Sequence, residues 1–412
     1  MLSTRRSNYR RYQMDNKLAI YGGKPVIGFN LEKYIWVDKG VMPRIESLIL
    51  SNSFSGFLAQ PTPEHFGGPS VRLFEAEWSK LSDVEHAVTF NSWTSGLMAA
   101  VAALDLEKGS EVIVTPWTMS ASVACIVANN LVPVFADIEV DSFNIDPDDV
   151  ARKITSKTSG ILAVDIFGKP CDAPALAKLA SERGLKFLVD SAQAPRAQIA
   201  GKRTAAFADI AGYSLNRHKH IQVGEGGIAV TNNQEYAERL KLMRNHAEVS
   251  SGSTPNNSIQ VGHNWRMGEI EAELARYQIE SFDSHIDHRV NSSLKLLRML
   301  SQVPGLILPR SDNNSDHDFY IIGMRLHDDL KGKRDLIAEA LKAEGLQILL
   351  VGYQALHRLP SFKGYRQEDL LQVNELHDSL FLGLYMCGHY FSDTDLEKIA
   401  EAFSKVMEYY IK

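Results

Sequence analysis

The chain contains little cysteine. Only three cysteines occur among its 412 residues, at Cys125, Cys171 and Cys387, and they lie far apart without a CxxC pair. The histidines are not grouped at metal-ligand spacing either. A zinc site and a disulfide framework are therefore not expected. Isolated cysteines suit a reducing compartment, so we expect a cytoplasmic protein without a metal.

Long apolar runs are also missing. No segment approaches the ~20 apolar residues that a helix needs to cross a bilayer. The N-terminus carries four arginines (Arg5, Arg6, Arg10 and Arg11), but the apolar stretch of a secretory signal does not follow them. We expect a soluble protein in which residues 1–17 form a disordered or loosely docked arm.

Neither sign of charge dominates the sequence. The 44 basic and 50 acidic residues are mixed along the chain and give a formal net charge of -6. This balance produces no broad positive field. Nucleic acid and anionic membranes are therefore not expected as partners.

The sequence does contain short β-rich runs that alternate with helical stretches. This alternation predicts an α/β fold with a mostly parallel sheet that helices cover on both faces. A chain of this length exceeds one hydrophobic core, and we predict a large domain over residues 18–285 and a smaller α+β domain over 286–412. The expected strands of the large domain are 87–90, 111–115, 133–137, 160–166, 186–190, 209–215 and 227–231.

Helices are expected at several places. Residues 173–183 carry apolar side chains at helical spacing and precede Gly184, which suits a helix C-terminus. A longer helix is expected to begin near Met267, just before the chain leaves the large domain at 281–289. In the small domain, we expect a strand at 319–326, a helix at 333–343 and a final helix from about residue 392.

Polar residues follow several expected strands, at the edge where open α/β sheets bind ligands. In the segment 91–96, Thr94 and Ser95 stand where a helix begins. Hydroxyls and backbone amides at a helix N-terminus bind phosphate. A simple N-cap is the alternative interpretation of this segment.

An acid ends the apolar strand at 186–190. Asp190 can keep the nitrogen of a pyridine ring protonated, which makes the ring an electron sink. Gln193 can donate a hydrogen bond to a ring oxygen. An aspartate that caps the next segment is the alternative.

A lysine follows the strand that ends near residue 215. Lys219 stands in a polar loop where it can form an imine with an aldehyde, and neighbouring cations are expected to lower its pKa. Ser214 can add a hydroxyl to a phosphate site. Further along, Asn264 lies in a polar turn and can either reach a phosphate or cap a helix. The alternative for Lys219 is a position on a solvated face of the protein, which is usual for a lysine among other basic residues.

Together these segments resemble the DegT-type sugar aminotransferase family, a branch of the fold-type I enzymes that use pyridoxal 5'-phosphate (PLP). The resemblance runs from about Leu18 to the last helix. Its most specific parts are the sequences VDSAQA at 189–194, GEGG at 224–227 and GHNWRM at 262–267, together with Ser214 five residues before Lys219.

The resemblance implies a fold-type I architecture with a seven-stranded, mostly parallel sheet, and it implies a role for each matching residue. Lys219 forms the Schiff base with PLP and later moves the proton, Asp190 contacts the pyridinium nitrogen, and Gln193 contacts the ring oxygen. The phosphate-binding residues implied are Thr94, Ser95, Ser214 and, from the partner chain, Asn264. A homodimer with shared active sites follows from that last contact.

The sequence departs from the family pattern in two places. Met119 stands where an aromatic residue usually covers the PLP ring, and Trp117, on the same face of an extended segment, is a rival candidate. Between Ser214 and Lys219, the usual aromatic and proline residues are replaced, and Arg217 and His218 become candidates for substrate selection.

Two histidines of the small domain, His317 and His357, match family positions near the substrate cleft. Each is a candidate substrate contact, and a structural histidine is the alternative.

The implied reaction has two stages. Glutamate, the donor that the family suggests, loads the cofactor with an amino group, which then passes to a nucleotide-linked keto-deoxy or keto-amino hexose in amino-sugar biosynthesis. Two other reactions stay open. One is amination of an inosose or similar cyclic keto polyol, because residues 18–25 faintly resemble the family branches that act on such rings. The other is PLP-dependent dehydration of a deoxysugar. A non-enzymatic regulatory protein would be expected to lack Lys219 or Asp190, and both are present.

Overall fold

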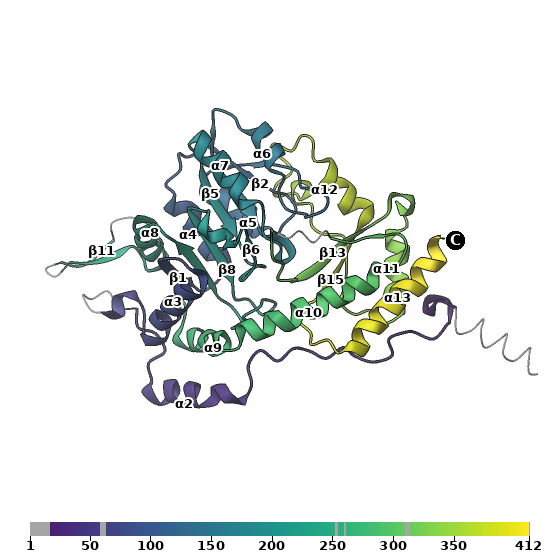
Figure 1. The fold of residues 1–412 in the computed structure, drawn as a ribbon. Helices are drawn as coiled ribbons and strands as arrows, with labels where there is room; N and C mark the ends of the chain where they lie inside the picture. Colours follow the sequence, from purple (N-terminus) through teal and green to yellow (C-terminus); the bar gives the residue numbers. More distant parts are fainter. Residues whose placement is uncertain (1–16, 58–62, 252–253, 259–260, 310–313, 412) are drawn as a thin grey trace, which may run out of the picture.

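Two β-sheets organise the chain in the computed structural model, which describes residues 17–57, 63–251, 254–258, 261–309 and 314–411 (Figure 1). The larger sheet has seven strands and the smaller one has four. This is the fold-type I architecture that the resemblance implied, with a mostly parallel sheet flanked by helices and a smaller α+β part after it. The smaller sheet is antiparallel.

The seven strands of the large sheet are those that the apolar runs predict. They are β1 (His86–Phe90), β2 (Glu111–Val114), β3 (Val132–Phe135), β4 (Thr158–Val164), β5 (Lys186–Asp190), β8 (Ile210–Ser214) and β9 (Gly227–Thr231). Their order is β1-β9-β8-β5-β4-β2-β3. β9 runs antiparallel to both of its neighbours, whereas β2, β3, β4, β5 and β8 are parallel.

Both faces of the large sheet are buried, which explains why its strands are apolar throughout rather than alternating. Successive residues of β4 show the division: Ile161 and Ala163 belong to one hydrophobic cluster, and Leu162 and Val164 belong to another. The first cluster includes side chains of α3, α7 and α9. The second includes α4, α5 and much of the small sheet, so it joins the two sheets.

The helices begin and end as follows. They are α2 (Met42–Ser51), α3 (Pro69–Ser82), α4 (Trp93–Ala103), α5 (Ala121–Ala128), α6 (Pro147–Lys153), α7 (Ala173–Arg183), α8 (Gln234–Arg244), α9 (Glu269–Ile279), α10 (Phe282–Leu300), α11 (Arg334–Ala343), α12 (Leu371–Glu375) and α13 (Asp393–Ile411). The predicted helices correspond to α7, α9, α11 and α13. Gly184 ends α7 with φ 65°, as a C-terminal glycine does.

The small sheet has the order β12-β13-β15-β14, with all pairs antiparallel. Its strands are β12 (Leu306–Ile307), β13 (Ile321–Leu326), β14 (Leu349–Val351) and β15 (Phe381–Tyr385). Only β13 is among the predicted strands. Two short hairpins complete the β-structure, β6 (Gln198–Ile199) with β7 (Lys202–Arg203), and β10 (Glu248–Ser251) with β11 (Thr254–Ser258).

The segment expected as the exit from the large domain is helical. It forms the start of α10, which includes residues 285 and 286 and packs against α13 (Figure 1). The predicted boundary therefore falls within a helix, and the division into domains at this point remains a prediction. Residues 1–16 of the predicted arm lie outside the described residues.

The three cysteines are unpaired and buried. Among the described residues, no helix has both the length and the apolar character that crossing a membrane requires. In the same part of the chain, no group of three or more acidic, histidine and cysteine side chains is placed to hold a metal ion.

Candidate active site

A cavity of about 640 Å³ lies between the edge of the large sheet, where β5 and β8 end, and the small sheet. Side chains from β13, β14 and β15 line its other wall. Of the predicted site residues, those that line this cavity are Thr94, Met119, Asp190, Gln193, Ser214, His218 and Lys219. Residues that are up to 125 positions apart in the sequence therefore meet at one site.

Asp190 lies at the end of β5 and is only 5% exposed. Its Oδ1 accepts hydrogen bonds from Trp93 Nε1 at 2.8 Å and from the Ala192 N–H at 3.2 Å. Its Oδ2 accepts one from Ser122 Oγ at 2.8 Å. A buried carboxylate needs such donors, and these fix its orientation toward the cavity.

The orientation of Gln193 follows from its partners. Its Oε1 accepts a hydrogen bond from the Phe167 N–H at 2.8 Å. Because a backbone N–H is only a donor, the amide NH₂ must point the other way. One N–H of that group donates to the Tyr353 hydroxyl, and the amide has a second N–H that can donate. The Gln193 NH₂ group is therefore a suitable donor to the oxygen of a bound pyridine ring.

Lys219 lies in a loop that is held in place by hydrogen bonds to its backbone. Its N–H donates to Asn216 O at 2.8 Å, and its own carbonyl accepts from Trp36 Nε1 at 3.0 Å. The neighbouring His218 carbonyl accepts from the Tyr385 hydroxyl at 2.7 Å. Lys219 Nζ lies 4.5 Å from the centre of the Tyr320 ring, within the range of a cation–π contact.

Burial lowers the pKa of the Lys219 amine to about 8, and the negative charge of Asp190 opposes this shift. The expected direction is therefore found, but the expected cause is wrong. Removal from water is the largest cause of the shift, and Arg217 and His218 are not among its causes. A lysine with such a pKa has a substantial neutral fraction near physiological pH.

The N-terminus of α4 borders the cavity. Ser92 caps the helix by accepting from the Ser95 N–H at 3.1 Å, and Ser95 Oγ donates to Asn91 Oδ1 at 2.6 Å. Thr94 is exposed and lines the cavity, whereas Ser95 is buried in this network beside it. Ser214 lines the cavity and accepts from the Asn216 N–H at 3.3 Å.

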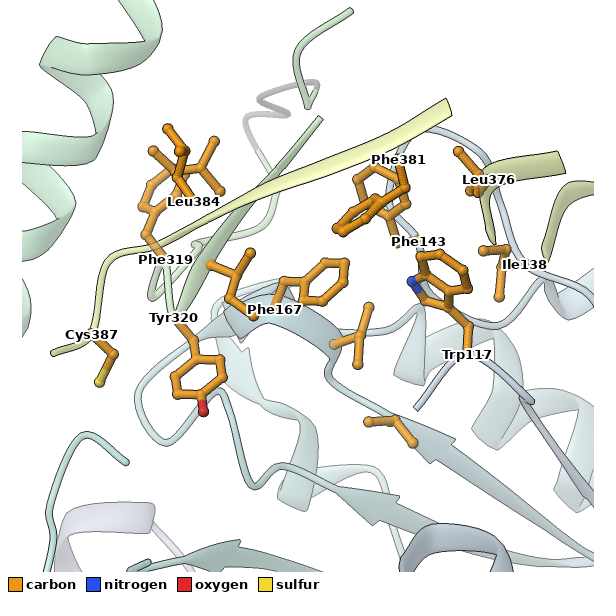
Figure 2. Packing of buried hydrophobic residues seen from close by; sticks show 14 of the residues in the cluster. Trp117, Ile138, Phe143, Phe167, Phe319, Tyr320, Leu376, Phe381, Leu384 and Cys387 are labelled. Atoms are coloured by element: carbon orange, nitrogen blue, oxygen red, sulfur yellow. The ribbon is translucent and has the colours of Figure 1, made fainter. Parts of the chain in front are cut away.

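The two candidates for covering a ring lie in different places. Met119 is 56% exposed and lines the cavity. Trp117 is fully buried and packs on Phe381, with ring centres 5.2 Å apart (Figure 2). The Tyr353 ring also packs on it, with ring centres 5.4 Å apart. Burial of a large indole among aromatic rings is strongly favoured, so Trp117 is a core residue that does not line the cavity.

Other predicted residues also lie outside the lining of this cavity. Arg217 is exposed on the loop, and its N–H donates to Gly224 O at 3.1 Å. His317 borders a separate cavity, where burial lowers its pKa to about 3 and its Nδ1 accepts from the Phe319 N–H. His357 is buried and bonds through Nε2 to Asn374. The surroundings of both histidines are those of a structural histidine, which is the alternative to a substrate contact.

Asn264 is exposed and also lies outside the lining of this chain's own cavity. It forms a backbone bridge with Asn245. A position away from its own site is what the implied contact with a partner chain requires.

Several residues of the site were not predicted. Trp93 lies inside the segment 91–96, but the predicted phosphate site in that segment depends on the neighbouring hydroxyl groups. Ser122 lies in α5, where nothing local relates it to Asp190. Tyr320 directly precedes β13 and Tyr353 follows β14, and only the tertiary fold brings them to the cavity.

The chain matches the model of the DegT/DnrJ/EryC1/StrS aminotransferase family over residues 61–403. It belongs to this family. It is therefore an aminotransferase, and its fold is that of the PLP-dependent members. The family match covers both sheets and every residue that lines the cavity.

Two curated relatives and one solved structure illustrate the similarity. The dTDP-3-amino-3,4,6-trideoxy-alpha-D-glucose transaminase of Streptomyces venezuelae is 32% identical over 299 residues, which cover 72% of this chain and 76% of that protein. GDP-perosamine synthase of Vibrio cholerae is 30% identical over 296 residues, covering 72% and 80%. The structure of S. venezuelae DesV in complex with a ketimine intermediate superimposes with a TM-score of 0.79 at 27% identity, covering 90% of this chain and 94% of that one.

Proposed function

We propose that this aminotransferase uses PLP to move an amino group from glutamate onto the keto carbon of a nucleotide-linked hexose. The observation that carries the proposal is the convergence of an acid, an amide and a lysine of lowered pKa, Asp190, Gln193 and Lys219, on one cavity beside the N-terminus of α4. The substrate class is supported by relatives named for GDP-linked and dTDP-linked amino sugars.

The donor set of the cavity fits PLP. A carboxylate held by three donors suits the ring nitrogen, an NH₂ group suits the ring oxygen, and the N-terminus of α4 with Thr94 and Ser214 suits the phosphate. Lys219 Nζ is the amine for the aldehyde. Met119 is our candidate for the residue that covers the ring. Ser95 would contribute to the phosphate site by way of the cap it forms with Ser92.

When bound, PLP supplies an electron sink and a temporary carrier for the amino group. Asp190 stabilises positive charge at the ring nitrogen. Lys219 acts twice, first as the amine that holds the cofactor and then, once released, as the base that moves a proton at Nζ. Because its pKa is about 8, both the neutral and the protonated amine are available near neutral pH.

We also propose a homodimer with shared sites, in which Asn264 reaches the phosphate bound to its partner. Helix α2 supports this proposal because none of its residues is buried, and it exposes Met42, Ile49 and Leu50, the last at 79%. An exposed apolar helix of this kind is typical of a protein interface. In Figure 1, α2 lies at the margin of the molecule, below α9.

The proposed function is tested by absorbance spectroscopy of the purified protein with added PLP. The wild type is expected to acquire a visible band from the lysine-bound cofactor, and glutamate should bleach that band. Lys219→Ala should not acquire it, whereas Lys178→Ala, at an exposed position on α7, should behave like the wild type. A wild type that never acquires the band would overturn the cofactor assignment. A band that glutamate leaves unchanged would overturn the donor alone.

Turnover products separate amination from dehydration of the sugar. With a nucleotide-linked keto hexose and glutamate, mass spectrometry should detect an amino sugar and 2-oxoglutarate in equal amounts. Loss of a hydroxyl group from the sugar without net amination would favour the dehydratase instead.

A further inference from the structure

Trp93 fits into a space that three glycines leave open. A Cβ atom at Gly212 in β8 would lie 2.0 Å from the Trp93 ring, and one at Gly96 in α4 would lie 2.5 Å from it. A Cβ atom at Gly227 in β9 would lie 2.4 Å from the Trp93 backbone nitrogen. Real side chains do not approach so closely, so Gly96 and Gly212 leave room for the indole and Gly227 leaves room for the backbone of Trp93.

The indole ends on the carboxylate of the site. Trp93 is 5% exposed, and its Nε1 donates to Asp190 Oδ1 at 2.8 Å. An indole nitrogen can only donate, and a hydrogen bond to an ionised group is stronger than one between neutral groups. With Ser122 Oγ on Oδ2, the two side chains hold the Asp190 carboxylate from both of its oxygens.

This hydrogen bond is not a general consequence of burying a tryptophan in this protein. Trp78 and Trp117 are buried just as deeply, and their Nε1 atoms have no hydrogen-bond partner in the described part of the chain. The contact between Trp93 and Asp190 is therefore specific to the site.

We propose that Trp93 is a positioning residue, which orients the Asp190 carboxylate toward the ring nitrogen of the cofactor, and that Gly96, Gly212 and Gly227 form the cradle that places its indole. The proposal rests on the proposed function, because it assigns Asp190 to the cofactor. Trp93 itself takes no part in the exchange of protons or amino groups.

The test compares Trp93→Phe with Trp78→Phe. Both variants lose an indole N–H from a buried ring, but only Trp93 uses that group. For Trp93→Phe, kcat should fall about ten- to a hundredfold, with KM for glutamate within about twofold of the wild-type value. The PLP dissociation constant from equilibrium dialysis should rise about tenfold. The pH titration of the bound cofactor's visible band should also shift. Trp78→Phe should show none of these three changes.

A second variant moves the indole without removing its N–H. Gly96→Ala should displace the ring and reproduce the losses of Trp93→Phe, because the only atoms within 3.0 Å of a Cβ there belong to the Trp93 ring. Gly160→Ala, in β4 of the large sheet, should not, because a Cβ there would meet its nearest atom at 3.4 Å. If Trp93→Phe does not fold, the comparison of these two glycine variants decides alone.

Wild-type values of kcat, PLP affinity and band titration in Trp93→Phe, or in a folded Gly96→Ala variant, would overturn the proposal. An Asp190→Asn variant separates this outcome from failure of the proposed function. If Asp190→Asn abolishes turnover while Trp93→Phe has no effect, only the positioning role is wrong. If Asp190→Asn also has no effect, the assignment of Asp190 to the cofactor is wrong, and both proposals fall.

Discussion

Lys219 differs from an ordinary lysine in the fraction that is neutral at physiological pH. Its pKa of about 8 compares with about 10.4 for a solvated lysine. Only the neutral amine attacks an aldehyde. The initial rate at which the protein acquires the PLP band should therefore rise with pH and level off above a midpoint near 8. Stopped-flow absorbance with protein freed of PLP measures this profile, and a midpoint near that of a solvated lysine would contradict the burial argument.

The charge of Asp190 predicts the direction of a second effect on the same amine. Asp190 raises the pKa of Lys219, opposing the effect of burial. Asp190→Asn removes this charge, so the pKa of Lys219 should fall and the midpoint of the uptake profile should move to lower pH. Asp209→Asn, at a carboxylate outside the lining of the cavity, is the matched control and should leave the midpoint in place. A shift to higher pH in Asp190→Asn would show that the carboxylate does not act on Lys219 as a charge.

At the scale of elements, the sequence predicts the strands and helix ends that depend on residues close together in the chain. The strands of the large sheet are apolar runs because both of its faces are covered, and α7 ends at a glycine with positive φ. The antiparallel direction of β9 leaves no local sign, and β12 and β14 have only two and three residues. β15 was missed although its five residues equal the length of β1. The partners of Asp190 leave no local sign either. Trp93 and Ser122 lie 97 and 68 positions away in the chain.

The start of α3 illustrates a helix end that no local pattern reveals. Its N-cap residue, Gly68, has no side chain to offer. Glu269, the first residue of α9, replaces the missing cap: it is 1% exposed and accepts from the Ser70 and Val71 N–H groups at 2.7 and 3.3 Å. A Cβ at Gly68 would lie 2.4 Å from this carboxyl group, which explains the glycine. The cap thus joins two helices 199 residues apart.

Removing this cap should destabilise the protein without touching the active site. Glu269→Ala leaves two buried N–H donors unpaired, and we expect the free energy of unfolding to fall by about 2–4 kcal/mol. Glu271→Gln, in the same helical turn but partly exposed, should change it by less than about 0.5 kcal/mol. Urea unfolding followed by circular dichroism measures both variants. Equal losses in the two would show that the cap contributes little.

At the scale of the whole molecule, the N-terminal segment connects distant parts of the chain. The Ala19 and Val26 N–H groups donate to the buried carboxylate of Glu344, at the end of α11, at 2.7 and 3.0 Å. Further on, Trp36 donates to the Lys219 carbonyl. The segment then continues to α2, which presents apolar side chains to solvent. One stretch of chain therefore lies between the proposed dimer face and the loop that carries the lysine.

Shared sites predict that two inactive variants restore activity when they are combined. Lys219→Ala removes the lysine, and Asn264→Asp should place a negative charge beside the phosphate bound to the partner chain. In a mixed dimer, one site receives both intact residues and the other receives both changes. Co-refolding equal amounts should produce half mixed dimers and thus about a quarter of wild-type activity, although each variant alone is inactive. Activity that stays at the level of the separate variants would mean that Asn264 serves the site of its own chain, and a monomer in light scattering would exclude sharing altogether.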